Sequence, residues 1–153
     1  MIRLRSALTA ALLLAGLPAH AQGAEPRYRV LNVFSQGVHF VSTEVTGPQT
    51  LRSLTEVIVP RQAGPGGENL FVVTYTFDCV AGRLEMGEIA TYRGAERVGT
   101  APGDGRGMVK PVSDTSSTRM LSYACTGKLD SGDATVLTGL PAVFAFARQK
   151  LGL

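Results

Sequence analysis

The sequence is poor in aromatic residues, in cysteine and in clustered charge. It has no Trp, two Cys and two His among 153 residues, and aromatic side chains make up 7% of the chain. The Lys and Arg residues are scattered, whereas nucleic acid and anionic membranes both require a concentrated basic surface. We therefore expect no nucleic-acid partner. No apolar run after the first 21 residues is long enough to cross a bilayer, so we expect no membrane insertion of the exported chain.

The N-terminus has the features of an export signal. Arg3 and Arg5 precede the apolar run Ala7–Leu17, and Ala19-His20-Ala21 follows as a small-x-small cleavage pattern. The sequence thus predicts a signal peptide over residues 1–21, with cleavage between Ala21 and Gln22. The alternative is an uncleaved anchor, which the complete cleavage pattern disfavours. No cysteine follows the apolar run, which excludes lipid attachment there.

The exported chain, residues 22–153, is expected in the periplasm, secreted, or at the cell surface. Removal of Arg3 and Arg5 leaves 13 basic against 12 acidic residues, a net charge of +1. A chain of this length fits one domain with one core. We divide it into a flexible leader (22–27), a main domain (28–126) and a C-terminal extension that contains a helix (127–153).

The sequence of the main domain predicts a series of strands separated by turn residues. Residues 70–79 alternate most clearly, with Phe71, Val73, Tyr75 and Phe77 on one side and threonines on the other, as in a half-buried strand. Gly- and Pro-containing segments separate the other apolar stretches. The sequence predicts an antiparallel meander of about six strands, over 28–34, 38–41, 51–59, 70–79, 83–93 and 97–101.

Two helices are predicted to follow. The first covers residues 116–125, with N-cap candidates in 111–115 and a shared side formed by Ser117, Leu121, Ala124 and Cys125. The second covers 141–151 and carries an apolar stripe formed by Leu140, Val143, Phe144, Ala147 and Leu151, with Gly152 to end it. The segment 126–138 is expected to be polar and extended, apart from residues 134–137. The fold class is therefore α+β.

The cysteine pair gives the strongest structural inference. Cys79 ends the clearest strand on its core-facing side, and Cys125 lies near the end of the first helix. In an oxidising compartment two such cysteines favour one disulfide that ties the short helix to one side of the sheet. The alternative is a pair of free thiols.

No catalytic constellation emerges from the remaining candidates. His39 is the one histidine of the exported chain, and it lies in the apolar stretch 38–41, which favours a structural role over that of a catalytic base. Glu85 and Glu88 are expected on opposite sides of one strand, whereas Asp78 and Glu85 could meet across a hairpin. The glycine-rich loop 102–107 lacks the Lys-Ser/Thr of a phosphate-binding loop. We therefore predict a non-enzymatic protein with no metal and no cofactor.

Several of these residues together resemble the surface-adhesin protein E family. The order is Tyr75-Thr-Phe-Asp-Cys79, then Arg83-Leu-Glu-Met, Tyr92-Arg-Gly94, a glycine-rich loop, Pro111-Val112 and a helix that ends in Cys125. The stretches 37–42 and 51–59 also look like that family's opening strands, so the resemblance covers roughly residues 28–126. Two features depart from the family: the Trp before the Pro is replaced by Met108 or Val109, and the tail from Lys128 extends past the usual end.

The resemblance implies an antiparallel sheet with a helix tied to one side by a disulfide, and Cys79 and Cys125 as structural residues. It also implies an exported binding domain, because the best-known member binds extracellular-matrix proteins and plasminogen and can dimerise. We expect an extracellular-matrix or envelope protein as partner, contacted by the sheet face or the C-terminal helix. The alternatives are a periplasmic structural or accessory protein without a host ligand and, more remotely, a small secreted hydrolase. A homodimer through an exposed strand edge is a further hypothesis.

Overall fold

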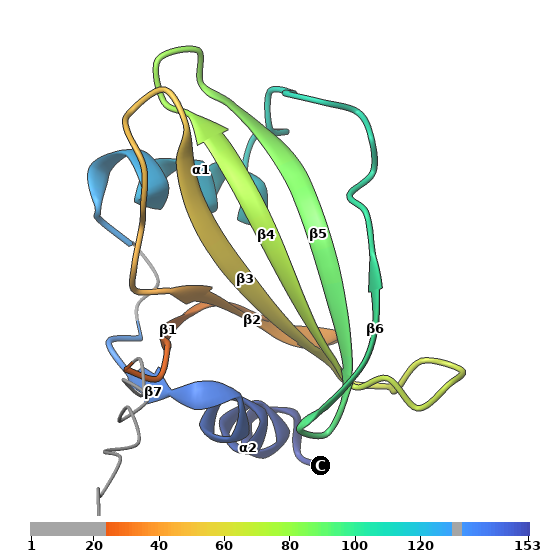
Figure 1. Ribbon diagram of the computed structural model, residues 1–153. Helices are drawn as coiled ribbons and strands as arrows, with labels where there is room; N and C mark the ends of the chain where they lie inside the picture. The colour runs from red at the N-terminus through yellow and green to blue at the C-terminus, as the bar shows by residue number, and fades with distance from the viewer. Residues whose placement is uncertain (1–23, 130–132) are drawn as a thin grey trace, which may run out of the picture.

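The computed structural model describes residues 24–129 and 133–153 (Figure 1). The predicted signal peptide and its cleavage site lie outside these residues. The described chain forms seven strands and two helices: β1 (Arg27–Phe34), β2 (Gly37–Ser42), β3 (Arg52–Pro60), β4 (Leu70–Asp78), β5 (Arg83–Arg93), β6 (Glu96–Ala101), α1 (Ser116–Thr126), β7 (Val136–Thr138) and α2 (Gly139–Leu151).

The strands form one antiparallel sheet in the order β6-β5-β4-β3-β2-β1-β7. The six predicted strands and their meander order are confirmed. The seventh strand, β7, was not predicted as one, because three residues are too short for an alternating pattern to be recognised. It pairs with Arg27–Arg29 at the start of β1. The C-terminal extension is therefore part of the same sheet as the main domain.

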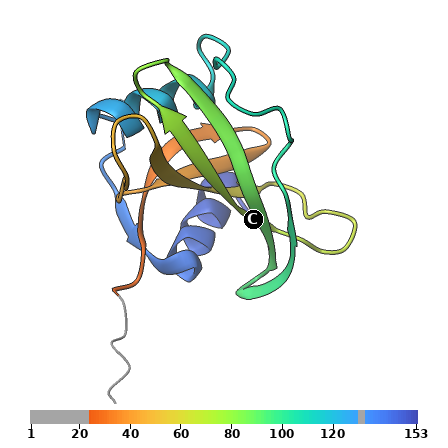
Figure 2. The ribbon, with the colours of Figure 1, turned by 45° about the horizontal axis from the view of Figure 1, so that its top comes forward.

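The sheet is buried on two sides, with one helix on each. In β3, Leu54 and Ile58 face the core cluster that contains α1, whereas Val57 and Val59 face the cluster that contains α2. This follows from the alternation of side chains along a strand. Figures 1 and 2 show the two helices apart from each other, α1 beside the long strands β3–β5 and α2 near β7. We call the two sides the α1 side and the α2 side.

Helix α1 has the predicted extent, but its buried side differs from the expected one. Met120, Tyr123 and Ala124 are buried, whereas Leu121 is only partly buried where it packs against this core cluster. The expected N-cap bond is also absent: the Thr115 hydroxyl donates to the carbonyl of Val112 rather than accepting from a helix amide. The helix is thus positioned by its contacts with the sheet and by its disulfide rather than by a side-chain cap.

Helix α2 confirms the prediction of a C-terminal helix with an apolar stripe. It begins two residues earlier than expected, and Val143, Ala147 and Leu151 are buried against the sheet. Gly152 ends it with a φ of 69°, a left-handed conformation that glycine adopts without strain. Because the apolar stripe packs inside the domain, it is not a free surface for a partner.

The disulfide is confirmed. Cys79, directly after β4, is bonded to Cys125 near the end of α1, with the two Cα atoms 5.5 Å apart. The amide of Cys79 also donates to the carbonyl of Gln49, at 3.0 Å. The disulfide therefore joins α1 to the end of β4, and a backbone hydrogen bond joins the same end of β4 to the connection before β3. No helix of the described part of the chain is both long and apolar enough to span a membrane.

Both edges of the sheet carry features that disfavour pairing with another strand. In β6 the pairing with β5 shifts register between Thr91 and Tyr92, which leaves Val98 as an extra residue, and the strand begins with Glu96 and Arg97. Bulges and charges of this kind are common protections of edge strands. The other edge, β7, is three residues long. The hypothesis of a dimer through a strand edge remains a prediction.

We expect the double substitution Cys79→Ser/Cys125→Ser to lower the free energy of unfolding by about 4 kcal/mol, because the unfolded chain regains the entropy of a loop whose ends are 46 residues apart. Urea unfolding of both proteins, each purified without reductant, measures the difference. A loss below about 1 kcal/mol would show that the packing of α1 holds it in place without the link.

Candidate functional site

A group of hydroxyl side chains forms the uncovered part of the α2 side. Ser53 and Thr55 precede Val57 on the same side of β3, and Thr74 and Thr76 follow Val72 on the same side of β4. Ser53 lies directly opposite Thr76, and Thr55 lies opposite Thr74. Helix α2 contacts β1, β2 and β7, which leaves these residues partly or fully exposed. We call these four residues the hydroxyl surface.

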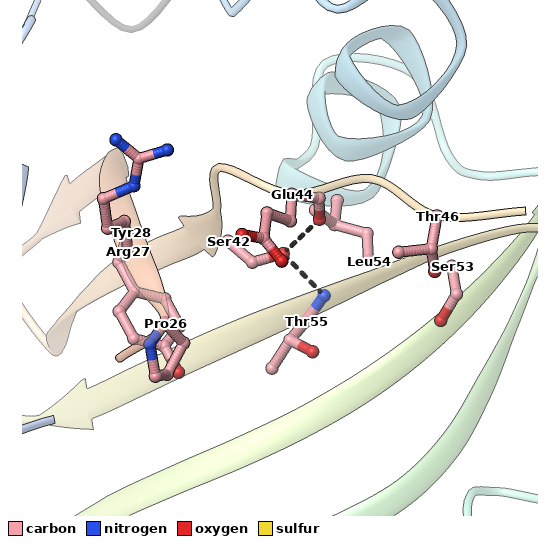
Figure 3. Close-up of a pocket in the computed structure, with 9 residues that line it drawn as sticks. All are labelled: Pro26, Arg27, Tyr28, Ser42, Glu44, Thr46, Ser53, Leu54 and Thr55. Carbon is pink, nitrogen blue, oxygen red and sulfur yellow. Dashed lines mark hydrogen bonds between the residues drawn. The ribbon is translucent and has the colours of Figure 1, made fainter. Parts of the chain in front are cut away.

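A hollow of about 180 Å³ borders the hydroxyl surface. Figure 3 shows it between the start of β1, the end of β2 and the start of β3. The hydroxyl of Ser42 donates to the carbonyl of Glu44 at 2.9 Å and accepts from the amide of Thr55 at 3.2 Å. Glu44 also lines the hollow, whereas Figure 3 shows the Arg27 guanidinium pointing away from Ser53 and Thr55.

A second polar group is buried on the α1 side. Glu56 is 2% exposed, and its carboxylate oxygen lies 2.8 Å from Nδ1 of His39. The His39 ring also meets the ring of Phe34 edge to face, with centroids 5.3 Å apart. A buried carboxylate is costly unless hydrogen-bonded, so His39 acts as its supporting donor. This agrees with the predicted structural role of His39.

Tyr75, on β4, is the third member of the buried polar cluster formed by His39 and Glu56. Burial, followed by the charge of Glu56 and a hydrogen bond to it, raises the pKa of the Tyr75 hydroxyl above its ordinary value, and the charge of Asp104 adds to the rise. The hydroxyl therefore stays protonated and donates. His39, Glu56 and Tyr75, which lie on three neighbouring strands, make up a group that we call the buried triad.

Helix α1 is attached to β1 beside the buried triad. The side-chain amide of Asn32 donates to the Ser116 hydroxyl at 2.8 Å, and its carbonyl oxygen accepts from Arg119. Asn32 lies opposite His39, because β1 shifts register between Val30 and Asn32. The start of α1 is thus held by polar contacts, and its end by the disulfide.

The carboxylates considered as a catalytic pair lie differently from the prediction. Asp78 accepts from the amides of Val80 and Ala81, at 3.0 and 2.9 Å, so it stabilises the turn after β4. Glu85 lies opposite Thr76, next to the hydroxyl surface, and Glu88 forms an ion pair of 2.7 Å with Arg97. A bulge in β5 breaks the alternation on which their opposite placement was predicted, and both carboxylates line one hollow.

The loop 102–110 folds over β5 on the α1 side. Val109 exchanges two backbone hydrogen bonds with Leu84, of 2.9 and 2.8 Å. A side chain at Gly103 would meet the carbonyl oxygen of Met86, so only glycine allows this approach. The loop is therefore attached to β5 at Val109, and together with α1 it borders a hollow of about 340 Å³.

Sequence reasoning found His39 but missed its partners. The strand predicted over 51–59 contains Glu56, and a charged residue at an alternating core position, between Leu54 and Ile58, is a signal of a buried polar group. Tyr75 was placed correctly on the core side of β4. Within residues 24–129 and 133–153, no Ser, Thr or Cys side chain hydrogen-bonds His39, and no three of His, Cys, Asp and Glu gather closely enough to hold a metal ion.

Comparison with known proteins adds no relative. No protein-family model matches the chain, and neither a curated protein nor a solved structure matches it significantly.

We expect His39→Leu to lower the free energy of unfolding by about 2 kcal/mol, because the buried Glu56 carboxylate loses its donor. His39→Gln keeps a side-chain donor and should recover at least half of that loss. Urea unfolding at pH 7.5 compares the three proteins. Equal stability of wild type and His39→Leu would contradict the supporting role of His39.

Ionisation of Tyr75 should weaken the fold at high pH. Its pKa is raised by folding, so its contribution to stability is complete below the ordinary tyrosine value of about 10 and is lost as the pH rises toward the folded value. The loss reaches at most about 1.4 kcal/mol per pH unit for one group. Tyr75→Phe should show a shallower decline between pH 9.5 and 11 in urea unfolding. Burial also raises the pKa of Tyr28, so the stability of Tyr75→Phe should still decline in part over this pH range. Parallel curves for the two proteins would disprove this role of Tyr75.

Proposed function

We propose that this protein is an exported binding domain that contacts an extracellular-matrix or envelope protein through the hydroxyl surface. The proposal rests first on the resemblance of residues 28–126 to the surface-adhesin protein E family. The α+β fold, with a helix tied by a disulfide to the side of an antiparallel sheet, agrees with that resemblance. The disulfide is also compatible with an exported protein.

The observation that carries the choice of surface is the uncovered pair of hydroxyl rows on β3 and β4. Ser53 and Thr55 face Thr76 and Thr74 across a rigid sheet, so four donors and acceptors are held in a fixed pattern. The surface is bordered by Glu44 on one side and by Glu85 on the other. Interfaces of non-obligate complexes are about as polar as the rest of a protein surface, and the hydroxyl surface offers hydrogen bonds and, at its borders, negative charge.

The periplasmic accessory protein without a host ligand is the second candidate. One observation favours it: the hydroxyl surface is the part of the α2 side that α2 leaves in water, and a polar part of an antiparallel sheet in water needs no partner. The remote alternative of a hydrolase has one supporting feature, the orientation of His39 by the Glu56 carboxylate, which resembles the base and its orienting acid in a catalytic triad.

The test is a binding experiment on the protein recovered after export, with its disulfide intact. It is passed over immobilised matrix proteins and plasminogen, and separately over purified envelope proteins. Thr74→Arg places a long cation on the exposed centre of the hydroxyl surface, and Ser122→Arg makes the same change on the exposed side of α1. We expect Thr74→Arg to weaken binding at least tenfold and Ser122→Arg to leave it within twofold.

Equal binding by wild type and Thr74→Arg would exclude the hydroxyl surface as the contact. Cell fractionation then separates the two main candidates. A surface or released pool that retains a matrix protein supports the binding domain, whereas a purely periplasmic pool excludes an adhesin role and supports the accessory protein.

A further inference from the structure

The hydroxyl surface continues into a second hollow, on β5 and β6. Glu85 lies directly opposite Thr76 of the hydroxyl surface. Glu88 lies two residues before Ala90, which is opposite Val72 and so belongs to the α2 side as well. Both carboxylates line this hollow of about 510 Å³, and no Lys or Arg is among the described residues that line it. Figure 1 shows β4 and β5 extending well beyond α2, so the helix leaves this part of the sheet uncovered.

Carboxylates border the hydroxyl surface in two directions. Glu44, just after β2, lines the smaller hollow together with Ser53 and Thr55. Glu85 and Glu88 lie beyond β4, on β5. The backbones of β2 and β5 are three strand spacings apart, which is about 14 Å. A positively charged segment of a partner that lies across the hydroxyl surface therefore meets carboxylates at both of its borders.

The cations near this surface do not neutralise its borders. The Arg27 guanidinium points away from the hydroxyl surface (Figure 3). Arg97 pairs with Glu88 at 2.7 Å, but 50% and 61% of these side chains are exposed, and an ion pair that is so exposed contributes little. Arg83 lies opposite Asp78 at the end of the β4–β5 hairpin, so these two charges offset each other. The borders therefore hold three carboxylates against one cation: Glu44, Glu85 and Glu88 against Arg97.

The fold holds two of these carboxylates in place before a partner arrives. Glu85 and Glu88 are three residues apart, and regular alternation would place them on opposite sides of β5. The bulge in β5, across from Val73–Tyr75, turns both of them toward one hollow. Bulges of this kind re-aim side chains next to functional sites. Because β5 is paired with a strand on each side, little backbone entropy is lost when a partner binds.

We propose that the hydroxyl surface takes a basic segment of its partner protein. This inference rests on the proposed function and names the chemistry of the partner. Lys or Arg side chains of the segment donate charge-assisted hydrogen bonds to the carboxylates at the borders. The polar groups between them bond to the Ser and Thr hydroxyls, which both donate and accept. Complementary charge favours such a partner and rejects an acidic one.

The test is an NMR titration of the isotopically labelled exported protein, with its disulfide intact, at pH 7 and low salt. The probes are three capped eight-residue peptides in which Ser alternates with Lys, with Gln or with Glu. We expect the Lys peptide to shift the amides of Thr55, Thr74 and Thr76 saturably, at least tenfold more tightly than the Gln peptide. Added NaCl should remove most of that difference, because salt screens charges at exposed positions.

Two results of the titration would overturn the proposal. Equal affinity for the Lys and Gln peptides would show that charge does not select the ligand, and tighter binding of the Glu peptide would reverse the sign. The absence of saturable shifts at these threonine amides with 5 mM Lys peptide would refute the proposal as well.

Matched double substitutions then assign the charge to the border on β5. Glu85→Gln/Glu88→Gln should weaken the Lys peptide about fivefold at low salt, because each exposed charge contributes modestly. Glu96→Gln/Asp114→Asn removes two exposed carboxylates elsewhere, at the start of β6 and before α1, and should leave the affinity within twofold. An equal loss in both variants would overturn the proposal, because net charge alone would then attract the peptide.

A second substitution at Thr74 separates this inference from the proposed function. In the binding experiment with matrix and envelope proteins, Thr74→Glu adds a long side chain as Thr74→Arg does, but of the opposite charge. We expect Thr74→Glu to weaken binding of the partner protein less than Thr74→Arg. Equal losses would keep the hydroxyl surface as the contact and overturn the basic partner. Unchanged binding in both variants would exclude the hydroxyl surface, and the proposed function with it.

Discussion

The fold depends on burial of the central strands from both sides. Strand β3 presents Leu54 and Ile58 to α1, and Val57 and Val59 to α2, so neither helix can be removed without exposing the centre of the sheet. Burial of apolar surface on this scale is the dominant favourable contribution to folding. The C-terminal extension is thus structural: it supplies the helix that covers one side and the strand that ends one edge.

The two sides differ in what they bury. The α2 side is apolar where the helix covers it and hydroxyl-lined where it does not. The α1 side includes a charged residue in its core, Glu56, which a hydrophobic residue of similar volume could replace at less cost in desolvation. Its partners His39 and Tyr75 come from both neighbouring strands, so the polar group links β2, β3 and β4 beneath α1. The two sides of the sheet therefore differ in the polar groups that they hold.

Helix α1 is the point where these features meet. Its end is held by a covalent bond to the residue after β4, and its start by Asn32, whose position opposite His39 depends on the bulge in β1. Its own apolar contacts are few, with three buried residues. A short helix held at both ends can border a hollow without closing it, which a helix placed only by apolar packing would tend to do.

The sequence alone determined the strands, the order of the meander, both helices and the disulfide, because each leaves a local signal: alternation, turn residues, helical periodicity, or a pair of cysteines after a predicted export signal. Only the tertiary structure decided the rest. The pairing of β7 with β1, the position of Met120 rather than Ser117 on the buried side of α1, and the meeting of His39, Glu56 and Tyr75 all depend on residues far apart in the chain. Bulges in β1 and β5 shift the alternation by one residue, and no local pattern marks where they occur.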